Sequence, residues 1–93
     1  MSRPKRVHIG DRFWRVHKTR VPADRDGDCN WELGRIRVRS SLRGIDLMRV
    51  LIHELLHARL WDLDESVVTE FGEVVSAVLD AEGFRQADDH EDY

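Results

Sequence analysis

The sequence is short of cysteine and proline, and it lacks a long apolar run. Cys29 is the only cysteine, so no internal disulfide can form and a secreted disulfide scaffold is excluded. No apolar stretch approaches the roughly 20 residues of a membrane span, and none follows the basic start of the chain as in a signal peptide. With 93 residues, we expect a single domain over 1–93, in the cytoplasm and without a membrane partner.

Charge is unevenly divided along the chain. Residues 1–50 carry 13 lysines and arginines against 6 acidic residues, whereas residues 51–93 carry 2 against 12. Such a split can indicate an anionic partner for the basic half. The interpretation we favour is that the two halves fold together and attract each other.

The basic half shows two strand patterns. Residues 12–21 are rich in aromatic and β-branched types and end at a proline, and residues 33–39 alternate arginine with apolar residues. The second pattern is typical of a half-buried edge strand with a basic outer face. Residues 22–30 are turn formers throughout. We expect residues 1–6 and 86–93 to be flexible tails.

The acidic half shows two helix patterns. Leu47–Trp61 contains no glycine or proline and is apolar on most of its circumference, which predicts a buried helix with Asp46 as its N-cap. A second helix is expected over Glu65–Glu82, with Gly83 as its C-cap. It carries an apolar stripe, formed by Val67, Val68, Phe71, Val74, Val75, Val78 and Leu79. Together the patterns predict an α+β fold, with a two- to three-stranded antiparallel sheet packed on two long helices.

The first helix contains the motif HExxH, as His53-Glu54-Leu55-Leu56-His57. Residues four apart share one helix face, so both imidazoles can reach one zinc ion. Glu54 is rotated by about 100° from His53 around the helix axis, so it can activate a zinc-bound water without ligating the ion. The alternative is a solvated face that includes Arg49. We favour zinc, because three polar groups on an otherwise apolar helix need partners when they are buried.

A catalytic zinc needs a third protein ligand and an open position for water. Glu65 is our choice, because it opens the second helix on the side expected to face the first. Asp64, Glu70 and Glu73 are the other candidates. Glu65 could instead belong to a capping box with Asp62.

The motif and its surroundings resemble a known family. IHELLHA at 52–58, followed by an acidic LDE at 63–65 and an apolar helix, is similar to the HExxH zincin metallopeptidases. The resemblance covers residues 33–80 and is greatest to their small gluzincin-like members, including phage and prokaryotic proteins of the SprT-like and ImmA types. It implies a zincin-like domain in which the two histidines bind zinc and Glu54 is the general base.

The resemblance also implies where a substrate lies. The strand Gly34–Arg39 would be the edge strand along which an extended peptide or protein substrate binds, with Arg35, Arg37 and Val38 in contact. His17 on the preceding strand could supply an extra donor, although a surface histidine is the interpretation we favour.

The sequence therefore predicts a zinc-dependent metallopeptidase that hydrolyses peptide bonds. The alternative is a zinc-stabilised nucleic-acid-binding or adaptor protein without catalysis, which would use a basic two-stranded ribbon to contact phosphates. The basic side chains of that ribbon are Arg12, Arg15, Lys18, Arg20, Arg35, Arg37 and Arg39.

Overall fold

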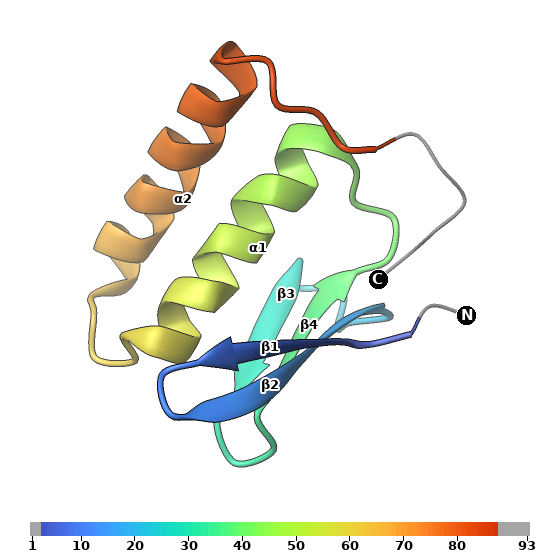
Figure 1. Ribbon diagram of the computed structural model, residues 1–93, viewed down its shortest axis with the longest axis vertical. Helices are drawn as coiled ribbons and strands as arrows, with labels where there is room; N and C mark the ends of the chain where they lie inside the picture. The colour runs from blue at the N-terminus through green and yellow to red at the C-terminus, as the bar shows by residue number, and fades with distance from the viewer. Residues whose placement is uncertain (1–2, 88–93) are drawn as a thin grey trace.

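The computed structural model describes residues 3–87, so residues 1–2 and 88–93 of the tails expected at 1–6 and 86–93 lie outside the described residues. Four strands are followed by two helices that run side by side (Figure 1). The elements are β1 (Lys5–Ile9), β2 (Arg12–Thr19), β3 (Gly27–Asn30), β4 (Arg35–Arg39), α1 (Gly44–Arg59) and α2 (Glu65–Ala81). The fold is α+β, as the sequence predicted.

The sheet is larger than expected and is mixed. Its strand order is β1-β2-β4-β3, with β2 and β4 parallel and the other two pairs antiparallel. The expectation of two or three antiparallel strands was wrong. Residues 5 and 6 belong to the segment expected to be a flexible tail, residues 7–9 to a segment for which no element was predicted, and residues 27–30 to one expected to be a turn. Both β1 and β3 are too short and polar to show a strand pattern, and each is held by a longer neighbouring strand.

The edge of the sheet also lies elsewhere than expected. β4 is an internal strand between β2 and β3, so Gly34–Arg39 is not the edge strand. Val38 is 0% exposed, and the Arg37 guanidinium is paired with the Asp28 carboxylate of β3. Alternating arginines can occupy the solvent face of an internal strand as well as an edge. The edge strands are β1 and β3.

The core lies between the inner face of the sheet and α1. Every second residue of β2 and β4 faces inward, which agrees with the alternation seen in the sequence. α1 covers these side chains with residues at helical spacing. The buried apolar cluster consists of Trp14, Val16, Ile36, Val38, Leu47, Val50 and Ala58.

α1 begins three residues earlier and ends two residues earlier than the sequence suggested. Its N-cap is Arg43, followed by Gly44 with φ of +59°, whereas Asp46 lies in the first turn. A carboxylate there still interacts favourably with the helix dipole. The helix ends at Arg59, and Trp61 lies beyond it, 70% exposed rather than packed.

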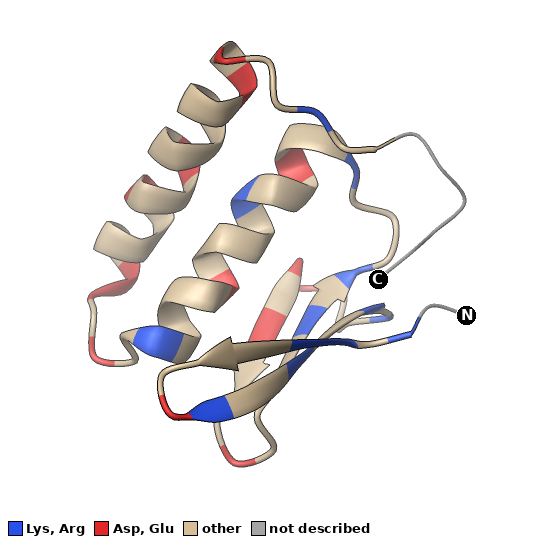
Figure 2. Ribbon diagram, viewed as in Figure 1, with Lys and Arg blue, Asp and Glu red and all other residues tan. Residues whose placement is uncertain are grey.

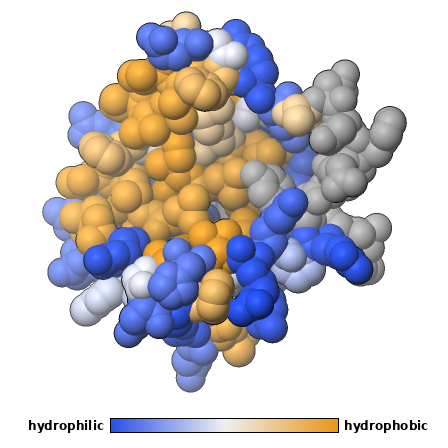
Figure 3. Space-filling view, in the orientation of Figure 1, coloured by the Kyte–Doolittle hydropathy of each residue, from blue (hydrophilic) through white to orange (hydrophobic). Residues whose placement is uncertain are grey.

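α2 packs on α1 through a narrow strip, not through its whole apolar stripe. Val68, Gly72 and Ser76 are buried against α1. The outer part of the stripe is exposed, because no further layer covers α2 within the described residues. It forms part of the apolar surface that runs over the two helices in Figure 3. The exposed residues are Val67, Phe71, Val74 and Val78. Neither described helix is long and apolar enough to cross a membrane.

Candidate metal centre

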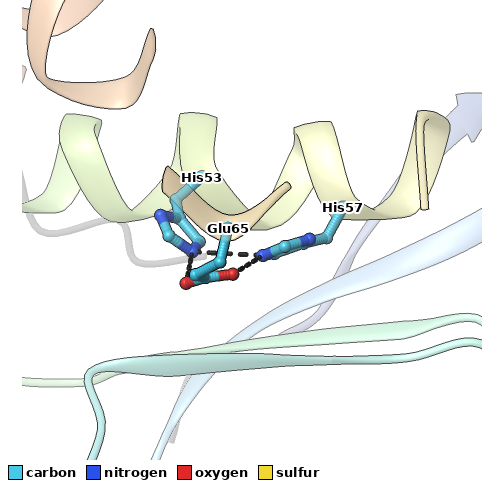
Figure 4. A group of neighbouring side chains, drawn as sticks. All are labelled: His53, His57 and Glu65. Carbon is cyan, nitrogen blue, oxygen red and sulfur yellow. Dashed lines mark hydrogen bonds and ion pairs between the residues drawn. The ribbon is translucent and has the colours of Figure 1, made fainter. Parts of the chain in front are cut away.

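Three donor groups converge between the two helices (Figure 4). His53 and His57 lie one turn apart on α1, and their Nε2 atoms are 3.2 Å apart. Glu65, the first residue of α2, brings one carboxylate oxygen to 3.0 Å from His53 Nε2 and the other to 2.8 Å from His57 Nε2. The donors therefore come from two segments that the loop at 60–64 folds back on each other.

The donor set fits a zinc ion. Ligands bound tetrahedrally at about 2.0–2.1 Å are about 3.3 Å from one another, close to the 3.2 Å between the two Nε2 atoms. Two histidines and one glutamate are a ligand set that catalytic zinc sites use. The group could hold a metal ion, and zinc remains a prediction from this chemistry.

The other acidic candidates lie away from this group. Asp64 is the N-cap of α2, where its carbonyl oxygen accepts hydrogen bonds from the backbone N–H groups of Val67 and Val68. Glu70 and Glu73 lie on the exposed side of α2. In the part of the chain that the structure describes, only His53, His57 and Glu65 gather in this way. Of the four acidic candidates, Glu65 is the one whose carboxylate lies beside both imidazoles.

A glycine in α2 allows the two helices to approach closely. A Cβ atom on Gly72 would lie 3.1 Å from the Arg49 carbonyl oxygen and 3.8 Å from His53 Cβ. A larger residue would push α2 away from the turn of α1 that carries the first histidine. This packing role was not predicted, although an isolated glycine inside a helix pattern often has a packing reason.

Gly72→Val is expected to lower the free energy of unfolding by about 1–3 kcal/mol, the usual cost of overpacking. It should also weaken zinc binding, because it separates Glu65 from the histidines. Denaturant unfolding and a zinc titration measure the two effects. Ala77→Val is the matched control, since Ala77 is exposed on the same helix. Equal losses of stability and of zinc affinity in the two variants would contradict the packing role of Gly72.

Glu54 is a buried carboxyl beside the donor group. It is 7% exposed and packs near Gly27 of β3, where an added Cβ would lie 3.3 Å from Glu54 Cγ and 2.8 Å from the Arg37 carbonyl oxygen. Burial, followed by the charges of Asp28 and Glu65, raises the pKa of Glu54 to about 7. A carboxyl with a pKa near neutrality is suited to take up and release a proton.

A cleft of about 370 Å³ joins these groups to β3. Glu65 is 69% exposed and the two imidazoles are partly exposed, so the donor atoms are open to solvent on one side. The segment before and within β3 was expected to be a turn, so its part in the cleft was not predicted. The cleft is lined by Arg25, Asp26, Gly27, Arg49, Val50, His53, Glu54, His57 and Glu65.

Two further polar side chains, His17 and Cys29, lie outside the donor group. His17 is paired in register with Arg37 on the sheet face that points away from α1, so the sheet separates it from the histidines of the motif. Cys29 is a free thiol on β3. Burial, together with the charges of Glu54 and Asp28, raises its pKa to about 11, so the thiol is neutral and a poor zinc ligand.

The tryptophan that follows β3 supports the second histidine. Trp31 Nε1 donates a hydrogen bond of 3.1 Å to the His57 carbonyl oxygen, and its ring packs edge-on against Trp14 in the core. The contact fixes the end of α1 relative to the sheet.

Comparisons of the chain with protein-family models, with curated proteins and with solved structures gave no match. The resemblance to zincin metallopeptidases is therefore an expectation that rests on the residues at 52–58 and 63–65 alone.

Proposed function

We propose that the protein is a zinc-dependent metallopeptidase with a minimal zincin-like fold. His53, His57 and Glu65 would hold the zinc, and Glu54 would be the general base. The observation that carries the proposal is the meeting of three donor groups and a buried carboxyl in one open cleft beside an edge strand.

The donor count favours a catalytic site over a structural one. Structural zinc is closed by four protein ligands, whereas catalytic zinc has three and keeps a position for water or substrate. Among residues 3–87, three protein donors gather and no fourth joins them. A structural site would also have no use for a buried Glu54.

The chemistry follows from these groups. When bound, zinc supplies Lewis acidity, which polarises a carbonyl oxygen and makes water a stronger nucleophile at neutral pH. Glu54 takes the proton from the attacking water and passes it to the leaving amine nitrogen. Its raised pKa, due chiefly to burial, suits both transfers.

The substrate position that we propose is the free edge of β3. β3 pairs with β4 on one side only and begins at Gly27, which lines the cleft. An extended peptide can add to such an edge through backbone hydrogen bonds, which would bring a scissile carbonyl to the donor group. This edge replaces the internal strand that the sequence had suggested, so Arg35, Arg37 and Val38 have no part in the proposed contact.

The test is hydrolysis of an unfolded protein. The zinc-loaded chain is incubated with β-casein, and mass spectrometry looks for products with new N-termini. We expect cleavage that stops when a chelator removes the metal and returns when zinc is restored. If the zinc-loaded chain cleaves no peptide bond, the peptidase proposal fails even though the metal site stands.

A further inference from the structure

Three arginines lie side by side on the outer face of the sheet, which points away from α1. Arg6 of β1 is in register with Arg15 of β2, and Arg15 is in register with Arg35 of β4. We call these residues the arginine row. In Figure 2, basic residues are frequent on β1, β2 and β4, whereas α2 carries acidic residues and no basic ones. Within residues 3–87, no carboxylate forms an ion pair with any member of the row.

The neighbouring arginines on the same face are neutralised. Arg37 is paired with Asp28, and Arg39 Nε lies 3.2 Å from Asp26 Oδ1. On this face of the sheet, Arg37 and Arg39 are therefore balanced by carboxylates, whereas the arginine row keeps its positive charge.

This arrangement costs stability in the free protein. Like charges directly opposite each other on paired strands repel, and here the pairing is repeated over three strands. In addition, Arg35 Nε is buried without a hydrogen-bond partner in the described structure. A multivalent anion lying across the strands would relieve the repulsion.

An aromatic pair lies next to the arginine row. His8 and Phe13 face each other across β1 and β2, with ring centroids 4.9 Å apart. The Arg6 guanidinium lies 4.2 Å from the centre of the Phe13 ring. Phe13 is nevertheless 55% exposed. An exposed aromatic ring beside cations is the combination on which the bases of single-stranded nucleic acid stack.

We propose that the outer face of the sheet binds single-stranded nucleic acid. Phosphates would contact the arginine row, and a base would stack on Phe13. A duplex fits less well, because four strands about 4.8 Å apart are about 14 Å wide, which exceeds the roughly 12 Å of a major groove. The surface lies across the sheet from the metal centre, so this proposal does not depend on the peptidase activity.

The first test is the salt dependence of binding. Fluorescence anisotropy follows labelled oligo-dT and oligo-U of about 15 nucleotides, which compares DNA with RNA. Three phosphate contacts predict a slope of about −2 for the logarithm of affinity against the logarithm of salt concentration. The double variant with Arg15→Gln and Arg35→Gln should reduce the slope to about −0.7. The double variant with Arg15→Lys and Arg35→Lys keeps both charges and should have the wild-type slope.

The second test separates stacking from charge. Phe13→Ala should weaken binding about fivefold or more without changing the salt slope. The matched controls are Arg43→Gln with Arg59→Gln for the charge and Phe71→Ala for the exposed aromatic, because these residues lie on the helical side of the molecule. Circular dichroism checks that each variant folds.

Three results would overturn the proposal. One is binding that does not depend on salt. Another is an equal loss of affinity in the control variants. The third is tighter binding to phosphatidylserine vesicles than to either oligonucleotide, which would make the face a membrane-binding surface instead.

Discussion

Glu54→Gln is expected to abolish peptide hydrolysis while the protein keeps its zinc. Glutamine has the same shape as glutamate and can still fill the space beside Gly27, but it cannot accept the proton from water. Loss of a general acid–base group lowers the rate by about 10²- to 10⁴-fold. Because Glu54 is not one of the three gathered donors, zinc affinity should change little. Hydrolysis of β-casein and a zinc titration on the same sample measure both quantities.

The matched control is Glu70→Gln, which makes the same chemical change on the exposed side of α2. It also tests the alternative third ligand. We expect wild-type hydrolysis and wild-type zinc affinity from it. Full activity in Glu54→Gln would remove Glu54 from the mechanism, and loss of zinc by that variant would mean that it ligates the metal.

His57→Ala is expected to weaken zinc binding by well over 100-fold. Substitution of a residue that only hydrogen-bonds to a metal ligand lowers metal affinity by about 10- to 100-fold. Substitution of a ligand itself should lower the affinity by more. Zinc at 100 times its dissociation constant stabilises a protein by about 2.7 kcal/mol. In a domain of this size that raises the melting temperature by about 10–20 °C. The variant should lose this rise, which a thermal melt with and without zinc measures.

His8→Ala is the control for the zinc experiment, because His8 lies on the outer face of the sheet. Glu65→Gln is the corresponding variant on α2 and tests whether Glu65 is a zinc ligand. Both His57→Ala and Glu65→Gln should melt near the metal-free wild type. A wild-type protein that shows no shift with zinc would disprove the metal centre, and a normal shift in Glu65→Gln would remove Glu65 from the ligand set.

The helical half of the molecule could be predicted from sequence because its signals are local. The spacing of His53 and His57 fixes their common helix face, and the apolar pattern defines both helices to within a few residues. Glu65 could be chosen because it follows a short loop that returns the chain to the same face. The structure brings its carboxylate to the two imidazoles.

The two longest strands could be predicted from their residue patterns, but the order and direction of the strands could not, because strand pairing is not local. β2 and β4 are parallel neighbours, which no pattern within either strand indicates. β3 has only four residues and contains Gly27 and Asp28, which are turn formers elsewhere. Its strand conformation depends on its pairing with β4 and on the approach of α1 to Gly27. The edge beside the cleft was therefore misplaced by one strand.

The attachment of α2 chiefly to α1 has a consequence for local unfolding. α2 contributes Glu65 and makes its main contacts with α1, so a fluctuation that lifts α2 can leave the sheet folded while it takes the donor group apart. Any ion held there adds its binding free energy to the cost of that opening. Binding of an ion there would therefore make opening of the helical hairpin rarer, because the ion must leave before α2 can separate from α1.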